Sequence, residues 1–282
     1  MNELQTLAVV GAGIMGLGIA QLGIQHGLPT ILFDLNPAAL EKAQAAIAAG
    51  LGKLVERGKL TAEARDAALA RLTLTTDLGT VQADVIVEAV VERLDVKHQL
   101  FQELAALNKL TTILASNTSS LPITQLAAPV PHPERVVGLH FFNPAPIMPL
   151  VEVIGGVATA PAVAAAVEAL ARRLGKTPVR AADAPGFIVN RVARHYYVES
   201  LKLVEEQVAP LEVVDELLEA SGFKMGPFRL MDLIGVDTNF AVTSAMFASF
   251  HQDAKFRPSR LQQQKVDAGH HGRKTGRGFY SY

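Results

Sequence analysis

Short apolar runs alternate with alanine-rich amphipathic stretches through the first two thirds of the chain. Continuous apolar runs predict strands that are buried on both faces, as in a parallel sheet covered by helices. We therefore predict a doubly wound, mostly parallel α/β sheet. Its strands are predicted at 7–10, 30–34, 71–74, 85–89, 112–115, 136–141, 151–154 and 178–180.

The pattern changes at Asp183-Ala184-Pro185-Gly186, a turn-forming cluster after which strand patterning stops. Apolar residues then recur at helical spacing in 187–206, 211–220 and 237–250, and a glycine-rich, basic tail follows at 269–282. The chain is therefore predicted to form two domains, residues 1–185 and a smaller, all-helical domain of residues 186–282.

A long helix is also predicted within the first domain. Asn36 and Pro37 provide an N-cap and a first-turn proline, and the amphipathic pattern runs from there to Arg57-Gly58. We expect this helix to form one arm of a protruding helical pair.

Composition narrows the class of protein. The chain has 282 residues, is 49% hydrophobic and 19% charged, and carries a formal net charge of -1, which argues against a nucleic-acid-binding protein. The absence of cysteine excludes disulfides and thiolate chemistry, and we expect no metal site. Met1–Gln5 lacks a basic leader segment, and no apolar run is long enough to span a bilayer. We expect a cytoplasmic protein.

The run from Gly11 to Gly16 matches G-x-G-x-x-G, with Gly13 as its middle glycine. It follows a predicted strand and opens a predicted helix, and Asp34 ends the next strand, as in a Rossmann-type dinucleotide site. An ordinary strand-to-helix turn is the alternative. A carboxylate accepts hydrogen bonds from a free ribose 2′-hydroxyl and repels a 2′-phosphate, and Leu35 offers no phosphate clamp. NAD is therefore favoured over NADP.

His140 and Glu152 lie on two consecutive predicted strands. A carboxylate against one ring nitrogen would fix the histidine tautomer and stabilise the imidazolium, which suits a general base for alcohol oxidation. A buried pair satisfying its own hydrogen bonds is an equally reasonable interpretation. The polar run 116–120 also follows a strand, where parallel sheets bind ligands, although it could serve only as a helix cap.

Several segments in order along the whole chain resemble the L-3-hydroxyacyl-CoA dehydrogenases. They are Ala115-Ser116-Asn117-Thr118-Ser119-Ser120, Gly138-Leu139-His140-Phe141-Phe142-Asn143-Pro144, Val151-Glu152-Val153, 183–191, Met225-Gly226-Pro227-Phe228 and 274–280. Within that family, the chain resembles members acting on 3-hydroxybutyryl-CoA or 3-hydroxyadipyl-CoA, the latter in phenylacetate breakdown. The resemblance implies NAD-dependent oxidation of the 3-hydroxyl of an acyl-CoA, as in β-oxidation, and a homodimer formed through the helical domain.

By position, the resemblance implies that His140 is the general base and Glu152 its orienting partner. Ser119 and Asn190 would hold the substrate oxygen. On the nicotinamide side of the cofactor it implies Glu92, Lys97, Asn143 and Lys274.

Coenzyme A is polyanionic, so a protein of near-neutral net charge needs local cations to bind it. Lys53, Arg57 and Lys59 are candidates, although such a cluster can also be an ordinary solvated face. Pro149 and Arg229 depart from residues common in the family, and we expect these departures to bear on acyl-chain preference or domain packing more than on reaction type. Two alternatives stay open, a dehydrogenase of free hydroxy or sugar acids such as gulonate, and a non-catalytic NAD-binding protein of the lambda-crystallin type.

Overall fold

The computed structural model describes residues 4–282, so the first three residues of the N-terminal stretch Met1–Gln5 lie outside the described part. The chain divides into two compact units, Met1–Ala184 and Pro185–Tyr282, one residue before the predicted boundary. Within the described residues, no helix combines the length and apolar character needed to cross a membrane.

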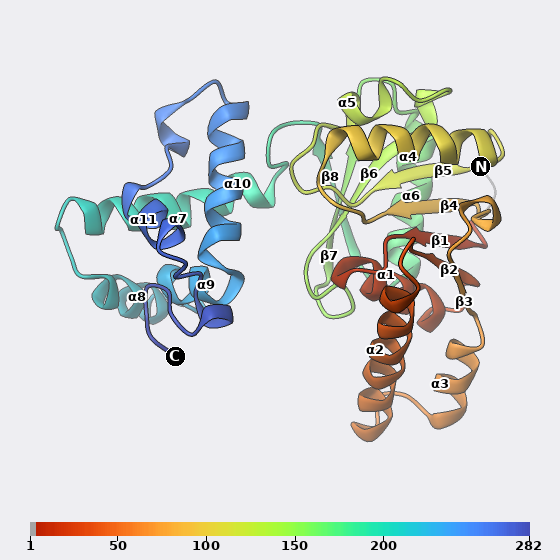
Figure 1. The fold of residues 1–282 in the computed structure, drawn as a ribbon, viewed down its shortest axis with the longest axis horizontal. Helices are drawn as coiled ribbons and strands as arrows, with labels where there is room; N and C mark the ends of the chain where they lie inside the picture. Colours follow the sequence, from red (N-terminus) through yellow and green to blue (C-terminus); the bar gives the residue numbers. More distant parts are fainter. Residues whose placement is uncertain (1–3) are drawn as a thin grey trace. The chain divides into compact units, whose positions relative to one another are not determined.

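The first unit is built on one eight-stranded sheet with the order β3-β2-β1-β4-β5-β6-β7-β8 (Figure 1). All neighbouring pairs are parallel except β6 and β7, which confirms the predicted mostly parallel sheet. Each strand lies within two residues of its predicted bounds. The strands are β1 (Leu7–Val10), β2 (Thr30–Phe33), β3 (Leu72–Thr75), β4 (Val85–Glu88), β5 (Ile113–Ser116), β6 (Val136–Phe141), β7 (Leu150–Gly155) and β8 (Thr177–Ala182).

Among the described residues of this unit, six α-helices accompany the sheet. They are α1 (Ile14–Gln25), α2 (Pro37–Glu56), α3 (Ala62–Leu69), α4 (Leu94–Leu107), α5 (Ile123–Ala127) and α6 (Pro161–Arg173). Asn36 caps α2 as predicted, since its side chain accepts a hydrogen bond from the Ala38 amide. The helix α2 packs against α3, which gives the predicted helical pair.

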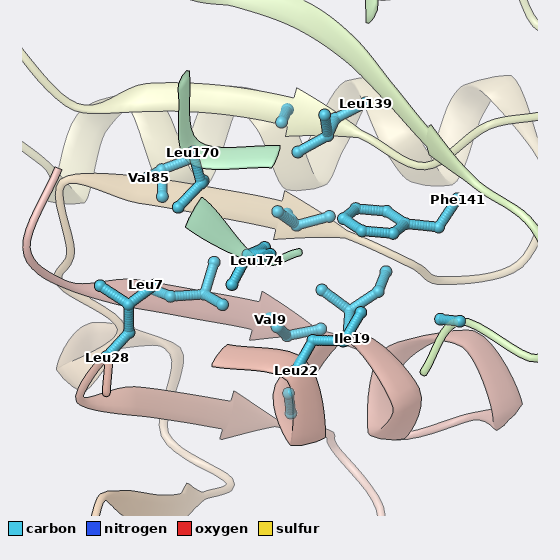
Figure 2. Close-up of a cluster of buried hydrophobic side chains, with 14 of the residues drawn as sticks. Leu7, Val9, Ile19, Leu22, Leu28, Val85, Leu139, Phe141, Leu170 and Leu174 are labelled. Atoms are coloured by element: carbon cyan, nitrogen blue, oxygen red, sulfur yellow. The ribbon is translucent and has the colours of Figure 1, made fainter. Parts of the chain in front are cut away.

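The core of this unit joins the strands to α1, α2 and α6. Strand residues such as Val9 and Phe141 pack with Ile19 of α1 and Leu170 of α6 (Figure 2). Burial of each such side chain contributes about 1.5–3 kcal/mol relative to exposure. This packing fixes the strand ends at which the polar residues of the site are found.

The second unit is helical, with α7 (Val189–Glu205), α8 (Leu211–Ala220), α9 (Pro227–Ile234), α10 (Val236–Ser249) and α11 (Arg260–Asp267). The fold class, a Rossmann-type sheet unit followed by a helical unit, is confirmed. The pattern did not predict α9 or α11, which are only eight residues long.

The C-terminal segment, predicted only as a glycine-rich basic tail, is held to the helices by two buried carboxylates. Asp232 accepts hydrogen bonds from the amides of Phe279 and Tyr280 at 2.9 Å each. The Tyr280 hydroxyl donates to Asp215 Oδ2 at 2.7 Å. Hydrogen bonds between residues this far apart in the chain leave no periodic pattern, so the sequence did not predict them.

Candidate active site

Three glycines shape the turn from β1 into α1, each for a different reason. Gly11 has φ +107, and a Cβ there would lie 2.6 Å from the Ala89 carbonyl oxygen. A Cβ on Gly16 would lie 1.7 Å from the Gly11 carbonyl oxygen, so only glycine lets the helix approach the turn. A Cβ on Gly13 would meet nothing within 4 Å, which leaves open space before the first turn of α1. A pyrophosphate could approach the helix N-terminus there.

Asp34 follows β2 directly beside this turn. Its Oδ2 accepts a hydrogen bond from the Ala12 amide at 2.8 Å, and its Oδ1 accepts one from Asn36 at 2.9 Å. Asp34, Gly11 and Gly13 also line a pocket of about 600 Å³, whose other walls include Phe33 and Leu100. A mostly apolar pocket with the Asp34 carboxylate in its wall suits the adenine and ribose of a dinucleotide.

His140 and Glu152 face each other across the antiparallel pairing of β6 with β7. They are directly paired in the register of β6 and β7, and His140 Nδ1 lies 2.8 Å from Glu152 Oε2. Both side chains are buried, with exposed fractions of 6% and 1%. Because a carboxylate can only accept, Nδ1 carries the proton and Nε2 is the nitrogen able to accept another.

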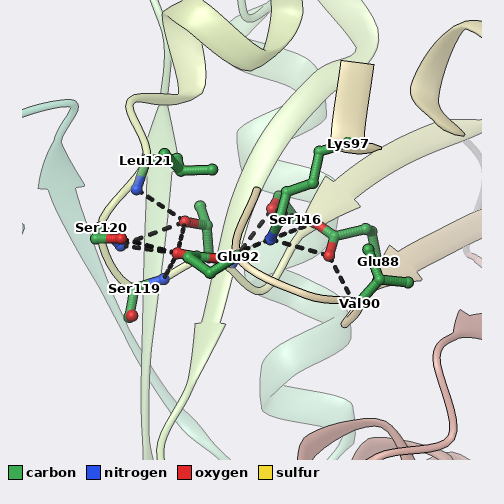
Figure 3. A network of polar contacts seen from close by, with 9 residues as sticks. Glu88, Val90, Glu92, Lys97, Ser116, Ser119, Ser120 and Leu121 are labelled. Atoms are coloured by element: carbon green, nitrogen blue, oxygen red, sulfur yellow. Dashed lines mark hydrogen bonds and ion pairs between the residues drawn. The ribbon is translucent and has the colours of Figure 1, made fainter. Parts of the chain in front are cut away.

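A buried charge network lies at the carboxyl ends of β4 and β5 (Figure 3). Lys97 of α4 is 1% exposed, and its Nζ lies 2.9 Å from Glu88 Oε1 and 2.7 Å from Glu92 Oε2. Ser116 adds a hydroxyl that donates to Glu88 Oε2 at 2.6 Å. The network therefore encloses one ammonium and two carboxyl groups.

The two carboxyl groups differ in environment. Burial raises the pKa of Glu88 above its usual range, although Lys97 and Ser116 act in the opposite direction. Burial also acts to raise the pKa of Glu92, but the charge of Lys97 and the hydrogen bonds to the side chain outweigh it, so that this pKa is lowered. Glu92 is thus the carboxylate that stays ionised.

Glu92 organises the loop that carries Ser119. Its Oε1 accepts hydrogen bonds from the Ser119 amide at 3.1 Å and from the Ser120 hydroxyl at 2.9 Å (Figure 3). The Thr118 hydroxyl donates to the same oxygen. The Ser119 loop is therefore fixed by a carboxylate that Lys97 in turn neutralises.

The other predicted residues lie in several places. Asn143 follows β6 and is exposed, and Lys53 and Arg57 are exposed at the C-terminal end of α2. In the second unit Asn190 lies in the first turn of α7, and Lys274 Nζ lies 2.7 Å from Asp237 Oδ1. The structure brings together His140 with Glu152, the glycine turn with Asp34, and Glu92 with Lys97 and the Ser119 loop. The predicted cofactor contacts of Lys97, Asn143 and Lys274 stay predictions.

Two residues of this region were missed as site residues. Glu88 ends an otherwise apolar buried strand, and that isolated polar position was the available signal. Asn117 accepts a hydrogen bond from the Phe141 amide at 2.8 Å through its Oδ1, which ties the loop after β5 to the residue next to His140.

A Rossmann-type fingerprint turn and a buried histidine-carboxylate pair on the same sheet are features expected of a nicotinamide-dependent dehydrogenase. The model of the 3-hydroxyacyl-CoA dehydrogenase NAD binding domain matches residues 6–184, and that of the C-terminal domain matches residues 186–282. The chain belongs to the 3-hydroxyacyl-CoA dehydrogenase family. The predicted family, the enzyme class and NAD as the cofactor are thereby confirmed.

Individual relatives agree with this assignment. The chain is 49% identical to the 3-hydroxyadipyl-CoA dehydrogenase of Escherichia coli K12, over 100% of its own length but 60% of that protein. It is 41% identical to a 3-hydroxybutyryl-CoA dehydrogenase of Mycobacterium tuberculosis H37Rv, covering 100% of the chain and 99% of the relative. The solved structure of (S)-3-hydroxybutyryl-CoA dehydrogenase from Ralstonia eutropha superimposes with a TM-score of 0.96 at 40% identity, over 99% of both chains.

Proposed function

We propose that this protein catalyses the reversible, NAD-dependent oxidation of the 3-hydroxyl of an L-3-hydroxyacyl-CoA to a 3-oxoacyl-CoA. The observation that carries the proposal is the buried contact of His140 with Glu152, 2.8 Å long, on the sheet that holds the fingerprint turn. NAD supplies the acceptor for the hydride that leaves C3.

The dyad performs the proton chemistry. Glu152 holds the Nδ1 proton, so Nε2 of His140 is available to take the proton of the 3-hydroxyl as the C3 hydride departs. Glu152 also stabilises the imidazolium that results. In reverse, that imidazolium returns the proton to the oxygen on C3.

Ser119 and Asn190 are proposed to bind the oxygen on C3. A hydroxyl and an amide can both donate to this oxygen without competing for the proton that His140 takes. The hydrogen bonds from the Ser119 loop to Glu92 support this role, because catalytic positioning requires a loop of fixed geometry.

The cofactor is proposed to lie along the glycine turn, with Asp34 on the ribose of the adenosine half. Glu92, Lys97, Asn143 and Lys274 are proposed for the nicotinamide half. The Lys97 ammonium already contacts both Glu88 and Glu92, which supports an indirect role for this residue. In that role Lys97 keeps Glu92 ionised.

The proposed substrates are 3-hydroxyadipyl-CoA and 3-hydroxybutyryl-CoA, the compounds named for the relatives. The exposed Lys53 and Arg57 are proposed cations for coenzyme A. A cytoplasmic homodimer stays a prediction.

The proposal is tested by following NADH absorbance with 3-hydroxybutyryl-CoA, 3-hydroxyadipyl-CoA and free gulonate. We expect turnover of the thioesters, and a fall in kcat of about 10²- to 10⁴-fold in His140→Gln while NAD binding persists. Activity on gulonate alone would indicate a sugar-acid dehydrogenase. NAD binding without turnover of any substrate would indicate a non-catalytic protein.

A further inference from the structure

A buried arginine without an acidic partner lies in the helical unit. Arg194 of α7 is 4% exposed, and no carboxylate lies within ion-pair distance of its guanidinium among the described residues. Its Nη1 donates to the Asn239 carbonyl at 2.9 Å and to the Thr243 hydroxyl at 2.8 Å. Its Nε is buried and has no hydrogen-bond partner within the described part of the chain.

The surroundings of Arg194 leave its charge uncompensated. The guanidinium lies 4.9 Å from the centre of the Tyr197 ring, a contact that stabilises a cation only modestly. Asp237, the acidic residue of α10, is paired with Lys274. Burial lowers the pKa of Arg194 to about 10, so the group stays protonated at neutral pH. Charged groups are rarely buried without a counter-ion, and an arginine fork with an unused N–H fits a carboxylate.

The position of Arg194 on its helix relates it to the proposed chemistry. Asn190 and Arg194 are four residues apart in α7, so they share one face and are separated by about 6 Å along the helix axis. In the proposed function Asn190 binds the oxygen on C3. An extended chain from C3 to C6 spans about 4 Å, and the hydrogen bond of a terminal carboxylate adds about 3 Å. The reach from C3 to a group that binds the terminal carboxylate, about 7 Å, is thus comparable to the separation of about 6 Å between Asn190 and Arg194 along the helix.

We propose that Arg194 binds the terminal carboxylate of a dicarboxylic 3-hydroxyacyl chain and so determines the acyl specificity of the enzyme. This inference rests on the proposed function and deepens it. The bound carboxylate supplies the missing counter-ion, and Asn239 and Thr243 hold the guanidinium from its other side. A methyl-terminated chain of the same length would leave the cation unpaired and would gain nothing from it.

Two substrates of equal length test the proposal, 3-hydroxyadipyl-CoA and 3-hydroxyhexanoyl-CoA, which differ only in the terminal carboxylate. We expect Arg194→Met to lower kcat/KM for the adipyl substrate about 100-fold, mainly through KM, because a charge-assisted bidentate bond is lost. The kcat/KM of Arg194→Met for the hexanoyl substrate should stay within about threefold of that of the unmodified protein. Arg194→Lys should recover part of the adipyl activity, since it restores the charge without the fork. Lys202→Met, which removes a partly exposed lysine of the same helix, is the matched control.

Binding of inert analogues to the unmodified protein tests the same idea even if Arg194→Met does not fold. Adipyl-CoA should inhibit at least about tenfold more strongly than hexanoyl-CoA, since a desolvated arginine-carboxylate bond contributes at least that factor. Equal inhibition, or an equal fall of both substrates in Arg194→Met, would overturn the role of Arg194 while leaving the dehydrogenase activity established. Absence of turnover with every CoA ester would overturn the proposed function and this inference with it.

Discussion

Replacing Lys97 tests the interpretation of the buried charge network. Its ammonium contacts Glu88 and Glu92 at 2.9 and 2.7 Å, and both Lys97 and Glu88 are 1% exposed. Lys97→Met therefore leaves a buried carboxyl group without its cation. Removing one partner of a buried ion pair costs about 3–5 kcal/mol of unfolding free energy, because the remaining charge is not compensated.

The loss should depend on pH, and the sign follows from Glu88. Burial already raises the pKa of this carboxyl, and without Lys97 the pKa rises further. Folded Lys97→Met then retains a proton that the unfolded chain has released. Its stability should fall as pH increases from the unfolded pKa, near 4.3, by up to about 1.4 kcal/mol per pH unit, until the raised pKa is passed. The unfolding free energy of Lys97→Met should thus fall further below that of the unmodified protein at pH 8 than at pH 5.5.

Hydrogen exchange measured by mass spectrometry on peptides covering β4 and β5 checks this prediction, with peptides from the helical unit as an internal reference. Lys42→Met, at an exposed position of α2, is the matched control and should change little. Adding Glu88→Gln to Lys97→Met should restore much of the protection, since it removes the uncompensated charge. Unchanged protection in Lys97→Met, or a deficit that does not vary with pH, would refute the reasoning.

Three further predictions follow from the turn, the ribose site and the C-terminal segment. Gly16→Ala should unfold at a lower temperature, because its Cβ would lie 1.7 Å from a carbonyl oxygen. Gly13→Ala should melt at the normal temperature but bind NAD at least about tenfold more weakly. Thermal melts with and without NAD would show both effects. Asp34→Ser should narrow the preference for NAD over NADP by at least about tenfold in kcat/KM, since it removes the charge that repels a 2′-phosphate, and an unchanged ratio would contradict the assignment. Asp232→Ala should lower the unfolding free energy by about 2–4 kcal/mol, because it removes the acceptor for two amides. Urea unfolding followed by tyrosine fluorescence would detect this loss, since all four tyrosines lie in the helical unit.

The sheet was predictable because its information is local. Apolar runs mark the buried strands directly, and the glycine turn and Asp34 belong to one short strand-helix-strand unit. The His140 and Glu152 pair could be named as a candidate from its strands, but only the antiparallel register of β6 and β7 shows that the two side chains meet.

The missed features depend on pairings that no sequence period reveals. Glu88 has its role only beside Lys97 and Ser116, 9 and 28 residues further along the chain. Arg194 depends on Asn239, 45 residues further along. The helices α9 and α11 are too short to give a strong period, and tertiary packing stabilises them more than intrinsic propensity does. Sequence patterns show that such residues are polar, but they do not show which buried partner each one has.

The antiparallel pairing of β6 with β7 also has a consequence for how this enzyme can diverge. His140 and Glu152 meet in a single register, and a slip of one residue would turn Glu152 to the opposite face of the sheet. The connecting segment, residues 142–149, carries none of that pairing. Substitutions at its exposed Ile147 can therefore alter what surrounds the proposed proton-transfer pair while the register of β6 and β7 is kept. Asn143, proposed to contact the cofactor, and Ala145, buried in the core, restrict changes elsewhere in the segment.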